Sequence, residues 1–362
     1  MKKILLVKLS SLGDVMAGTP FFRLLTEDCG LTVDHLVMEH CKAVTESNPY
    51  VNRQITVGAF PGGSRLKDAL SAYDLIRRLR VEKYDAAVAL HRSPLLGLLC
   101  RLSGIKRVYG LTSGPAAPAA GRRWRSGKAA STLHDVLLDE KLVFSPDVNR
   151  TLQEYALLKK AGFDIRKPEK LEFYIDDSRV DSKLLKTLPA GFISSNPGGA
   201  VNVHASMESK KWPIENYAEL YNRLDMPVAL LGHGPADAEI ERGIVSMCPN
   251  VISLVNRTNF HEAAAVIKRS ALYVGNDSSL VYLAAAVGTI SLALFGPTQR
   301  SALNPLGQRQ FYVESATRCS PCYNPLEGAS GRAYRCEDNT CMKSIPVAAV
   351  LEEIRRITGS AS

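Results

Sequence analysis

The sequence predicts an α/β protein with two domains, each built on a parallel sheet, that face each other across a cleft. Its 362 residues exceed what one ordinary hydrophobic core encloses, so two domains of about 150–180 residues are expected. Short apolar runs alternate with amphipathic stretches in both halves. In the stretch 272–298, an apolar run, a polar turn, an Ala-rich segment and a second apolar run follow one another, as in a βαβ unit.

The amino-terminal half begins with an expected buried strand at 3–7, followed by a polar turn at 10–14. A helix is expected from Thr19 and Pro20, because threonine favours the cap position and proline the first helical position. Further strands are predicted at 33–37, 54–57, 86–90 and 107–109, and helices at 67–79, 94–102, 133–144 and 152–161. The stretch 112–131 is rich in Gly, Pro, Ala and Ser, which indicates a functional or mobile loop.

The domain boundary is expected near an apolar run at 171–175, so that the domains comprise 1–175 and 176–362. A second alternation follows this boundary. Strands are predicted at 192–195, 228–231, 251–254, 272–274 and 290–295, and helices at 214–224, 237–247, 260–269, 279–287 and 346–357. Asp277 or Ser278 can cap the helix after the 272–274 strand, and helix starts of this kind bind phosphorylated ligands.

The composition narrows the classes of protein. Apolar residues make up 46% and charged residues 22%, as in globular proteins, and no apolar run approaches the ~18 residues of a spanning helix. The eight cysteines follow no secretion signal, so a reducing compartment is expected. The net charge of +9 suits an anionic membrane surface, an acidic substrate or nucleic acid. Nucleic acid ranks last, because no recognition motif accompanies the charge. Dinucleotide and P-loop fingerprints are also missing from the sequence.

Two polar segments follow predicted strands. Asp14 lies past the first strand, where a carboxylate can accept a proton from a hydroxyl group; a turn or capping residue is the alternative. The loop 196–211 contains Pro-Gly-Gly and then Lys210, which suits phosphate binding. A surface loop with solvated lysines is the alternative there, although Trp212 favours a fixed position.

Two further patterns point to ligands. The C-x2-C-x13-C-x4-C pattern of Cys319, Cys322, Cys336 and Cys341 fits a closed, structural Zn or Fe site, and four reduced thiols are the alternative. The basic residues Arg122, Arg123 and Arg125 could bind an anionic acceptor, or form a solvated loop.

Four stretches together resemble glycosyltransferase family 9, the ADP-heptose:lipopolysaccharide heptosyltransferases. They are VKLSSLGDVMAGTPFFRLL, KKWPIENYAEL, VGNDSSLVYLAAAVGTISLALFGPT and the cysteine-containing tail, in order from about residue 3 to residue 355. The resemblance implies the GT-B fold and a cytoplasmic enzyme, peripheral at the inner face of the inner membrane. It implies transfer of heptose from ADP-L-glycero-D-manno-heptose to a lipopolysaccharide core or lipid A acceptor. It also implies that the configuration at the anomeric carbon is inverted and that no cofactor is required for catalysis.

The resemblance also implies roles for individual residues. Asp14 matches the family's proposed general base, and Lys210 matches the lysine that contacts the donor diphosphate. An acidic residue near 235–237 would contact the ribose. The implied donor-binding positions are Asn276, Asp277, Ser278, Ser279, Tyr282, Gly296 and Thr298. Two of these depart from the family pattern, since Ser279 stands where the family has glycine and Tyr282 where it has histidine.

These departures keep two other interpretations open. One is a family member with a different nucleotide-sugar donor or a different acceptor. The other is a non-catalytic protein that binds sugar nucleotides, which Ser279 and Tyr282 favour but the presence of Asp14 and Lys210 disfavours. Nucleic acid is not an expected partner in any of them.

Overall fold

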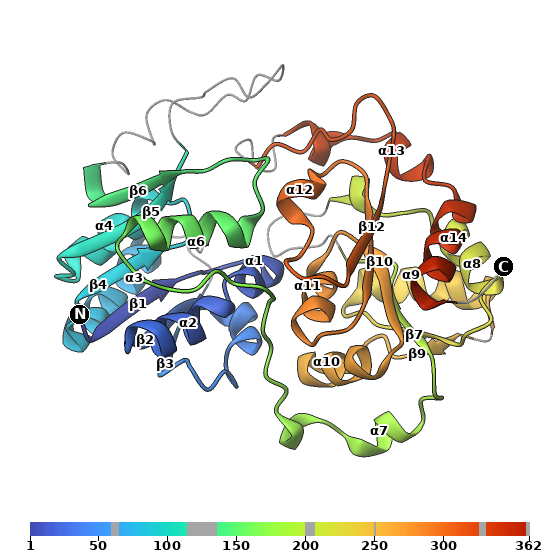
Figure 1. Ribbon diagram of the computed structural model, residues 1–362, viewed down its shortest axis with the longest axis horizontal. Helices are drawn as coiled ribbons and strands as arrows, with labels where there is room; N and C mark the ends of the chain where they lie inside the picture. Colours follow the sequence, from blue (N-terminus) through green and yellow to red (C-terminus); the bar gives the residue numbers. More distant parts are fainter. Residues whose placement is uncertain (59–64, 114–135, 200–206, 250, 326–330, 360–362) are drawn as a thin grey trace. The chain divides into compact units, whose positions relative to one another are not determined.

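The computed structural model describes residues 1–58, 65–113, 136–199, 207–249, 251–325 and 331–359, and the chain divides into two compact units (Figure 1). Unit 1 is Met1–Glu169 and unit 2 is Lys170–Ser362. The division falls six residues before the boundary expected from the sequence. Each unit has its own parallel sheet with helices on its faces, which confirms two Rossmann-like α/β domains.

Unit 1 has a six-stranded sheet in the order β3-β2-β1-β4-β5-β6, and its pairs are all parallel. The strands are β1 Lys3–Val7, β2 Thr32–Met38, β3 Arg53–Val57, β4 Ala86–Ala89, β5 Arg107–Thr112 and β6 Glu140–Val143. The helices are α1 Leu12–Ala17, α2 Pro20–Cys29, α3 Arg65–Glu82, α4 Pro94–Leu102 and α6 Arg150–Lys160, with a 3-10 helix, η1, at Glu39–Val44.

The side chains of β1 show how the unit 1 sheet is buried on both faces. Ile4 and Leu6 pack into a cluster with residues of α2 and α6, whereas Leu5 and Val7 pack on the opposite face with residues of α3 and α4. This alternation follows from the two-residue period of a strand. A strand covered on both faces has to be apolar throughout, which is the pattern that the sequence shows at 3–7.

Unit 2 repeats this plan with the strand order β12-β11-β10-β7-β8-β9, again parallel. Its strands are β7 Ile193–Asn196, β8 Val228–Leu230, β9 Ile252–Ser253, β10 Leu272–Asn276, β11 Ser291–Phe295 and β12 Gln310–Glu314. Its helices are α7 Ser182–Lys186, α8 Ile214–Asn222, α9 Pro235–Met247, α10 Phe260–Arg269, α11 Ser279–Ala286, α12 Arg300–Leu303, α13 Thr340–Lys343 and α14 Val347–Thr358, with 3-10 helices η2 Asp177–Arg179, η3 Glu208–Lys210 and η5 Arg332–Arg335.

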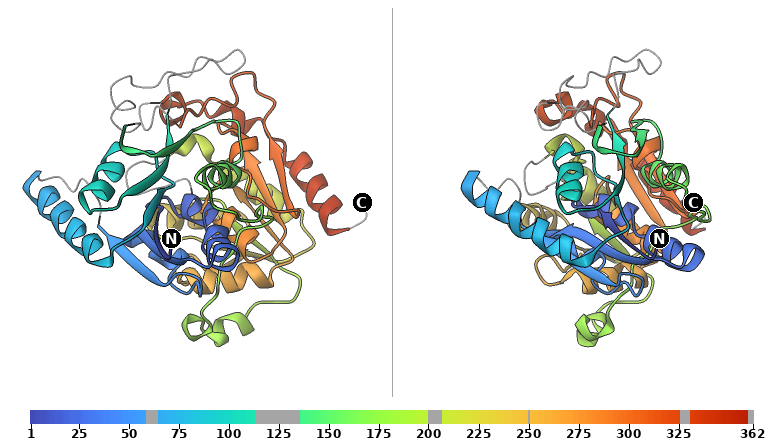
Figure 2. Two further views of the ribbon diagram at one scale, coloured as in Figure 1. Left: turned by 60° about the vertical axis from the view of Figure 1, so that its left-hand side comes forward. Right: turned by 90° about the vertical axis from the view of Figure 1, so that its left-hand side faces the viewer.

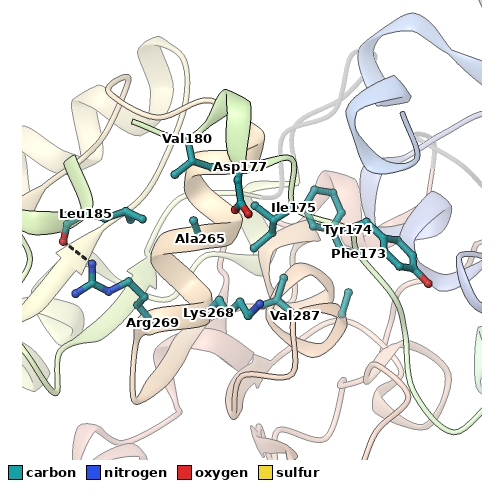
Figure 3. Close-up of a pocket in the computed structure, with 11 residues that line it drawn as sticks. Phe173, Tyr174, Ile175, Asp177, Val180, Leu185, Ala265, Lys268, Arg269 and Val287 are labelled. Atoms are coloured by element: carbon teal, nitrogen blue, oxygen red, sulfur yellow. Dashed lines mark hydrogen bonds between the residues drawn. The ribbon is translucent and has the colours of Figure 1, made fainter. Parts of the chain in front are cut away.

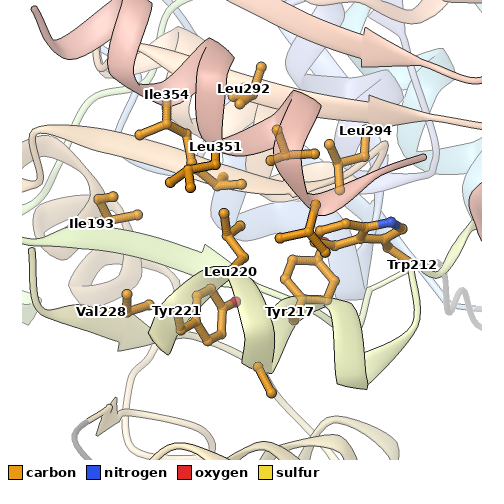
Figure 4. Packing of buried hydrophobic residues seen from close by; sticks show 14 of the residues in the cluster. Ile193, Trp212, Tyr217, Leu220, Tyr221, Val228, Leu292, Leu294, Leu351 and Ile354 are labelled. Carbon is orange, nitrogen blue, oxygen red and sulfur yellow. The ribbon is translucent and has the colours of Figure 1, made fainter. Parts of the chain in front are cut away.

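One face of the unit 2 sheet carries a large core in which α8 and α14 cover the strands (Figure 4). Trp212 and Tyr217 are its bulkiest members, both almost fully buried, with their rings edge to face at 4.9 Å. The indole nitrogen of Trp212 donates to the carbonyl oxygen of Ile345 at 3.1 Å, just before α14. Trp212 therefore fixes the segment before α8 against the carboxyl-terminal helix.

Two predicted elements differ in the structure, and the edge strand β12 was not predicted. The turn predicted at 10–14 is largely helical, because α1 begins at Leu12 with Ser11 as its cap. The helix predicted at 133–144 is wrong where the structure describes it: β6 forms at Glu140–Val143 and pairs with β5, although residues 136 and 137 are helical. Pairing at the sheet edge overrides the helical pattern of this leucine-rich stretch. Among the described residues no helix is long and apolar enough to cross a membrane.

Buried histidine makes the stability of unit 1 depend on pH. Burial lowers the pKa of His35 from 6.5 to about 3, and burial with the nearby Lys8 and Arg92 charges lowers that of His91 to about 4. Nε2 of His35 lies 3.2 Å from the carbonyl oxygen of Lys8, and Nδ1 lies 2.8 Å from Oγ1 of Thr45. Both contacts suit the neutral ring.

We expect the free energy of unfolding to fall as the pH drops below 6.5, because the unfolded chain then binds protons that the folded chain excludes. Chemical denaturation at about pH 7.5 and about pH 5.5 measures this fall, to which His35 should contribute about 1.4 kcal/mol. The variant His35→Gln should show a correspondingly smaller fall, with the exposed His233→Gln as its control. An equal fall in wild type and His35→Gln would contradict this account.

Candidate functional site

Each sheet has one point at which the direction of strand addition reverses. In unit 1 the chain adds β2 and β3 on one side of β1 and continues with β4 on the other side; in unit 2 it adds β8 and β9 on one side of β7 and continues with β10 on the other. Open α/β sheets bind ligands outside the carboxyl ends of the strands at such switch points. The predicted residues Asp14, Asn276, Asp277 and Ser278 follow β1 or end β10, so they lie at these two points.

Asn276, the last residue of β10, is fully buried and uses its whole amide within the protein. Its Oδ1 accepts hydrogen bonds from the backbone nitrogen of Trp212 and the hydroxyl of Tyr217, each at 3.0 Å. Its Nδ2 donates to the carbonyl oxygens of Pro197 at 2.7 Å and Gly198 at 3.1 Å. An asparagine amide can make four such bonds. Asn276 therefore serves the site by holding the loop after β7 and the segment before α8 in place.

Lys210 lies beside the next residue, Asp277. Its Nζ is 2.7 Å from Oδ2 of Asp277 and donates to the carbonyl oxygen of that residue at 3.2 Å. Both side chains are largely buried, with 17% and 6% exposed. The ammonium group has three donors. A partly exposed cation is therefore held at the carboxyl end of β10, next to the start of α11, where the cap residue Ser278 makes no side-chain hydrogen bond to the first-turn N–H groups.

The Gly-Gly turn after β7 is shaped by Asp237 of α9. Asp237 accepts backbone hydrogen bonds from His233 at 2.9 Å and Gly199 at 3.3 Å. A Cβ at Gly198 would lie 2.0 Å from Oδ1 of Asp237, and one at Gly199 would lie 2.9 Å from Cβ of Ser278. Gly199 also has a φ of +70°, which other residues rarely adopt. Asp237 is the acidic residue in the region expected to contact a ribose, and its carboxylate holds two loops together.

The buried side-chain oxygen atoms that have no hydrogen-bond partner in the described part of the chain include Oδ1 of Asn196, at the end of β7, and Oγ1 of Thr298, just after β11. Both residues are about 3% exposed, and an unsatisfied buried polar atom costs about 1–3 kcal/mol unless a ligand or water meets it. The sequence indicated Thr298. Asn196 was not predicted as a site residue, although its place at a strand end was a usable signal.

The two departures from the family pattern take different places on α11. Ser279 is its first residue and is half-buried, next to the cap residue Ser278. Tyr282 lies on the next turn, 7% exposed, and its hydroxyl donates to the carbonyl oxygen of Leu303 at 2.7 Å. Tyr282 thereby fastens α11 to the end of α12.

Gly296 stands where the cysteine-containing tail packs on the turn after β11. A Cβ there would lie 2.4 Å from Sδ of Met342 and 3.0 Å from Sγ of Cys341. The next residue, Pro297, accepts backbone hydrogen bonds from Cys322 and Tyr323, each at 2.8 Å. Gly296 is thus required by packing of the tail.

The prediction of a structural metal ion at the four cysteines is not supported, because no group of His, Cys, Asp or Glu in the described part of the chain can hold one. Their surroundings differ, with Cys319 exposed and Cys341 buried. Burial raises the pKa of Cys341 to about 11 and also raises that of Cys322. All four thiols are free of disulfide bonds, and Cys341 packs against the turn at Gly296.

In unit 1, Asp14 lies in the first turn of α1. Its Oδ2 accepts a hydrogen bond from the backbone nitrogen of its helix cap, Ser11, at 3.3 Å, in a capping box. Its Oδ1 pairs with the guanidinium of Arg150, the first residue of α6. The Asp14 side chain remains 26% exposed. The carboxylate is thus oriented by two partners and still accessible, as a general base has to be.

A second, buried ion pair supports this arrangement. Lys8, just after β1, pairs with Glu154 of α6, and its Nζ also donates to the carbonyl oxygen of Leu90 at 3.3 Å. Both side chains are under 5% exposed, and burial lowers the pKa of Lys8 and raises that of Glu154. Glu154 is one helical turn beyond Arg150. The pair therefore holds α6 to the end of β1, with Arg150 beside Asp14.

Arg122, Arg123 and Arg125 lie outside the described residues. The structure does describe a cavity of about 440 Å³ in unit 2, near the amino ends of β10 and β11 (Figure 3). Phe173, Tyr174, Lys268 and Arg269 are among its lining residues. Arg269 donates to the carbonyl oxygen of Leu185 at 2.7 Å. No residue predicted from the sequence lines this cavity.

Comparisons with known proteins agree with the fold and with the motifs. A family model described as glycosyltransferase family 9 (heptosyltransferase) matches residues 72–328, more than half of the chain. Lipopolysaccharide heptosyltransferase 1 of Pseudomonas aeruginosa is 26% identical over 345 residues, which cover 90% of this chain and 89% of that protein. Lipooligosaccharide heptosyltransferase 2 of Haemophilus influenzae is 25% identical over 329 residues, which cover 84% and 86%.

The solved structure of the ADP-heptose lipopolysaccharide heptosyltransferase II of Escherichia coli superposes with a TM-score of 0.73 at 21% identity, over 99% of this chain and 98% of that chain. This likeness shows that the fold is of the GT-B type. The family match, which carries the activity, shows that the chain belongs to glycosyltransferase family 9, the heptosyltransferases, and is an enzyme of glycosyl transfer.

Proposed function

We propose that this enzyme transfers heptose from ADP-L-glycero-D-manno-heptose to the inner core of a lipopolysaccharide, or to its lipid A-linked precursor, with inversion at the anomeric carbon. The observation that carries the proposal is the cation of Lys210 at the switch point of unit 2, fixed beside the start of α11. The heptosyltransferase relatives of Pseudomonas aeruginosa and Haemophilus influenzae support the class of sugar and acceptor. The donor named for the Escherichia coli enzyme supports the choice of ADP.

The donor diphosphate is assigned to Lys210 and to the backbone N–H groups that open α11. Helix amino termini attract phosphate, and a lysine adds a full positive charge. As the bond from the anomeric carbon to the diphosphate breaks, negative charge grows on the leaving group, and fixed donors stabilise it. Ser279, the first residue of α11, contributes its backbone N–H to this group of donors. Asp277 orients Lys210 and offers a carboxylate to sugar hydroxyls.

Two buried oxygen atoms that lack hydrogen-bond partners among the described residues supply the remaining contacts to the sugar nucleotide. Oδ1 of Asn196 and Oγ1 of Thr298 follow β7 and β11, the two strands that flank β10. Hydroxyl groups of the ribose or the heptose would satisfy them, and this recovers the cost of burying them. Asn276 and Asp237 keep the surrounding loops in place, and Tyr282 and Gly296 keep α12 and the tail in place.

The proton chemistry is assigned to Asp14. Its carboxylate removes the proton of the acceptor hydroxyl while the oxygen attacks the anomeric carbon, and ADP leaves from the opposite side of the sugar. A single displacement of this kind inverts the configuration. Arg150 is assigned as a positioning residue that holds Asp14. No metal ion takes part in the proposed steps.

Two alternatives share parts of this site. A different nucleotide sugar would keep the diphosphate contacts and change the others, and a non-catalytic protein would bind the donor without using Asp14. Initial rates with ADP-heptose and with GDP- and UDP-sugars distinguish the proposed donor from the different donor of the first alternative. The location proposed for the enzyme is cytoplasmic, peripheral at the inner face of the inner membrane, where its acceptor is made.

Replacing Lys210 by methionine should weaken ADP-heptose binding and lower kcat/KM by about 100-fold, because one fixed charge on the diphosphate is lost. Steady-state kinetics and titration calorimetry with ADP measure both effects. The neighbouring Lys211→Met variant is the matched control, since Lys211 pairs with Glu208 at 2.8 Å. Equal losses in the two variants would refute the role of Lys210.

Replacing Asp14 by asparagine keeps the shape of the side chain and removes its basicity. Transfer should fall by about 10³-fold, within the range that general-base catalysis supplies, while the Kd for ADP stays within about twofold. Asp164→Asn, which alters a carboxylate that is 99% exposed, is the control. Full transfer activity in Asp14→Asn would exclude Asp14 as the base.

A further inference from the structure

Helix α4 exposes leucines as well as burying them. Leu96 and Leu99 pack into the unit 1 core, whereas Leu95, Leu98 and Leu102 are 37–48% exposed. The exposed leucines are three and four residues apart, so they lie on one face of the helix. A helix that is apolar on all sides is usually covered on all sides. The outer face of α4 is therefore a surface suited to an apolar environment.

Helix α3 continues this surface. Leu70, Tyr73 and Val81 are 60–76% exposed, and together with Arg77 they follow the helical spacing of one outward face. The guanidinium of Arg77 lies over the ring of Tyr73, 6.0 Å from its centroid. The inward face carries Leu75 and Leu79, which pack in the same cluster as the buried leucines of α4.

The two helices lie side by side on one face of the unit 1 sheet (Figure 2). Nη2 of Arg80 in α3 donates to the carbonyl oxygen of Leu102 at the end of α4, at 2.6 Å. Their outward residues thus belong to one surface, the α3–α4 face, made by Leu70, Tyr73, Arg77, Val81, Leu95, Leu98 and Leu102.

Basic side chains surround the apolar part of this face. Arg77 and Arg78 lie on α3, and Lys83 and Lys106 follow the ends of α3 and α4; all four are exposed. Two of the acidic residues near them are each paired with a cation, whereas Arg77, Lys83 and Lys106 form no ion pair in the described part of the chain. Asp74 is 3.8 Å from Arg78, and Glu82 binds Lys3 at 2.6 Å, next to β1. The face is therefore apolar with a positive rim.

We infer that the α3–α4 face docks unit 1 on an anionic lipid membrane. Exposed leucines beside a tyrosine insert at the boundary of head groups and acyl chains, and arginine and lysine bind lipid phosphates while their stems cover apolar surface. Anionic lipids attract each such cation. A solvated surface or a neutral protein partner explains the leucines but leaves the positive rim without a role.

Membrane docking deepens the proposed function, and it rests on that function only for the reason why the enzyme would bind a membrane. An acceptor that carries lipid A is anchored in a membrane, so an enzyme on the same surface meets it by diffusion in two dimensions. Binding of the face to lipid does not require the donor or the acceptor, and it can be tested without either.

The test is flotation of the full-length protein with vesicles of phosphatidylglycerol and phosphatidylethanolamine, compared with vesicles of phosphatidylcholine alone. We expect the wild type to float with the anionic vesicles, and added salt to weaken the binding. The variant Leu95→Gln/Leu98→Gln/Leu102→Gln should bind at least about tenfold more weakly, because three partly exposed leucines no longer enter the membrane. The variant Arg77→Glu/Arg78→Glu should lose the preference for anionic vesicles.

The matched control is Val245→Gln/Met247→Gln, which changes exposed apolar residues of α9 in unit 2 and should float like the wild type. The inference is overturned if the wild type does not bind anionic vesicles or if the triple-leucine variant binds equally well. It is also overturned if light scattering shows that the wild type is a dimer and the triple-leucine variant a monomer, because the face would then be a contact between copies. Transfer to a water-soluble, deacylated acceptor tests the proposed function separately, and the leucine variant should retain it.

Discussion

The hydrogen bonds of the buried Asn276 amide hold the candidate donor site together. They connect the end of β10 with the Pro197–Gly198 turn and with the segment that contains Trp212. Lys210 lies two residues before Trp212, and Asp277 follows Asn276, so the same amide brings the two members of the ion pair together. Through the indole of Trp212, this arrangement continues to the segment before α14. The geometry of the candidate donor site therefore depends on the four hydrogen bonds of this one side chain.

Unit 1 uses charge for the same purpose. Lys8 and Glu154 are paired where almost no water reaches them, and removal of either would leave an uncompensated buried charge. Arg150, one turn before Glu154 on α6, then pairs with the carboxylate of Asp14. In both units the candidate functional group is held by a partner that is itself held by buried contacts. The residues of both candidate sites follow strands at the switch point of their sheet, where parallel strands end together.

Sequence patterns predicted the parallel sheets well, because strands buried on both faces are apolar throughout, as at 3–7. They failed at β6, an edge strand whose formation depends on pairing with β5. The first-turn position of Asp14 could have been recognised from the Ser11-x-x-Asp14 capping box. The pairings of Lys210 with Asp277 and of Lys8 with Glu154 join residues far apart in the chain, so local patterns carry no trace of them.

The same limitation applies to the tail and the surface. The cysteine spacing suggested a metal site, but spacing alone does not place four sulfur atoms around a point, and the tail instead packs Met342 and Cys341 on Gly296. The sequence predicted only a helix at 94–102, and the structure separates the leucines of α4 that face the sheet from those that face outward.

Hydrogen–deuterium exchange of the full-length protein with and without ADP tests the central claim most directly. If the donor binds at the switch point of unit 2, ADP should slow amide exchange in the segments after β7, around Lys210 and at the start of α11, and should leave the α3–α4 face unchanged. Protection centred on the cavity lined by Phe173, Lys268 and Arg269, with none at the start of α11, would contradict the account.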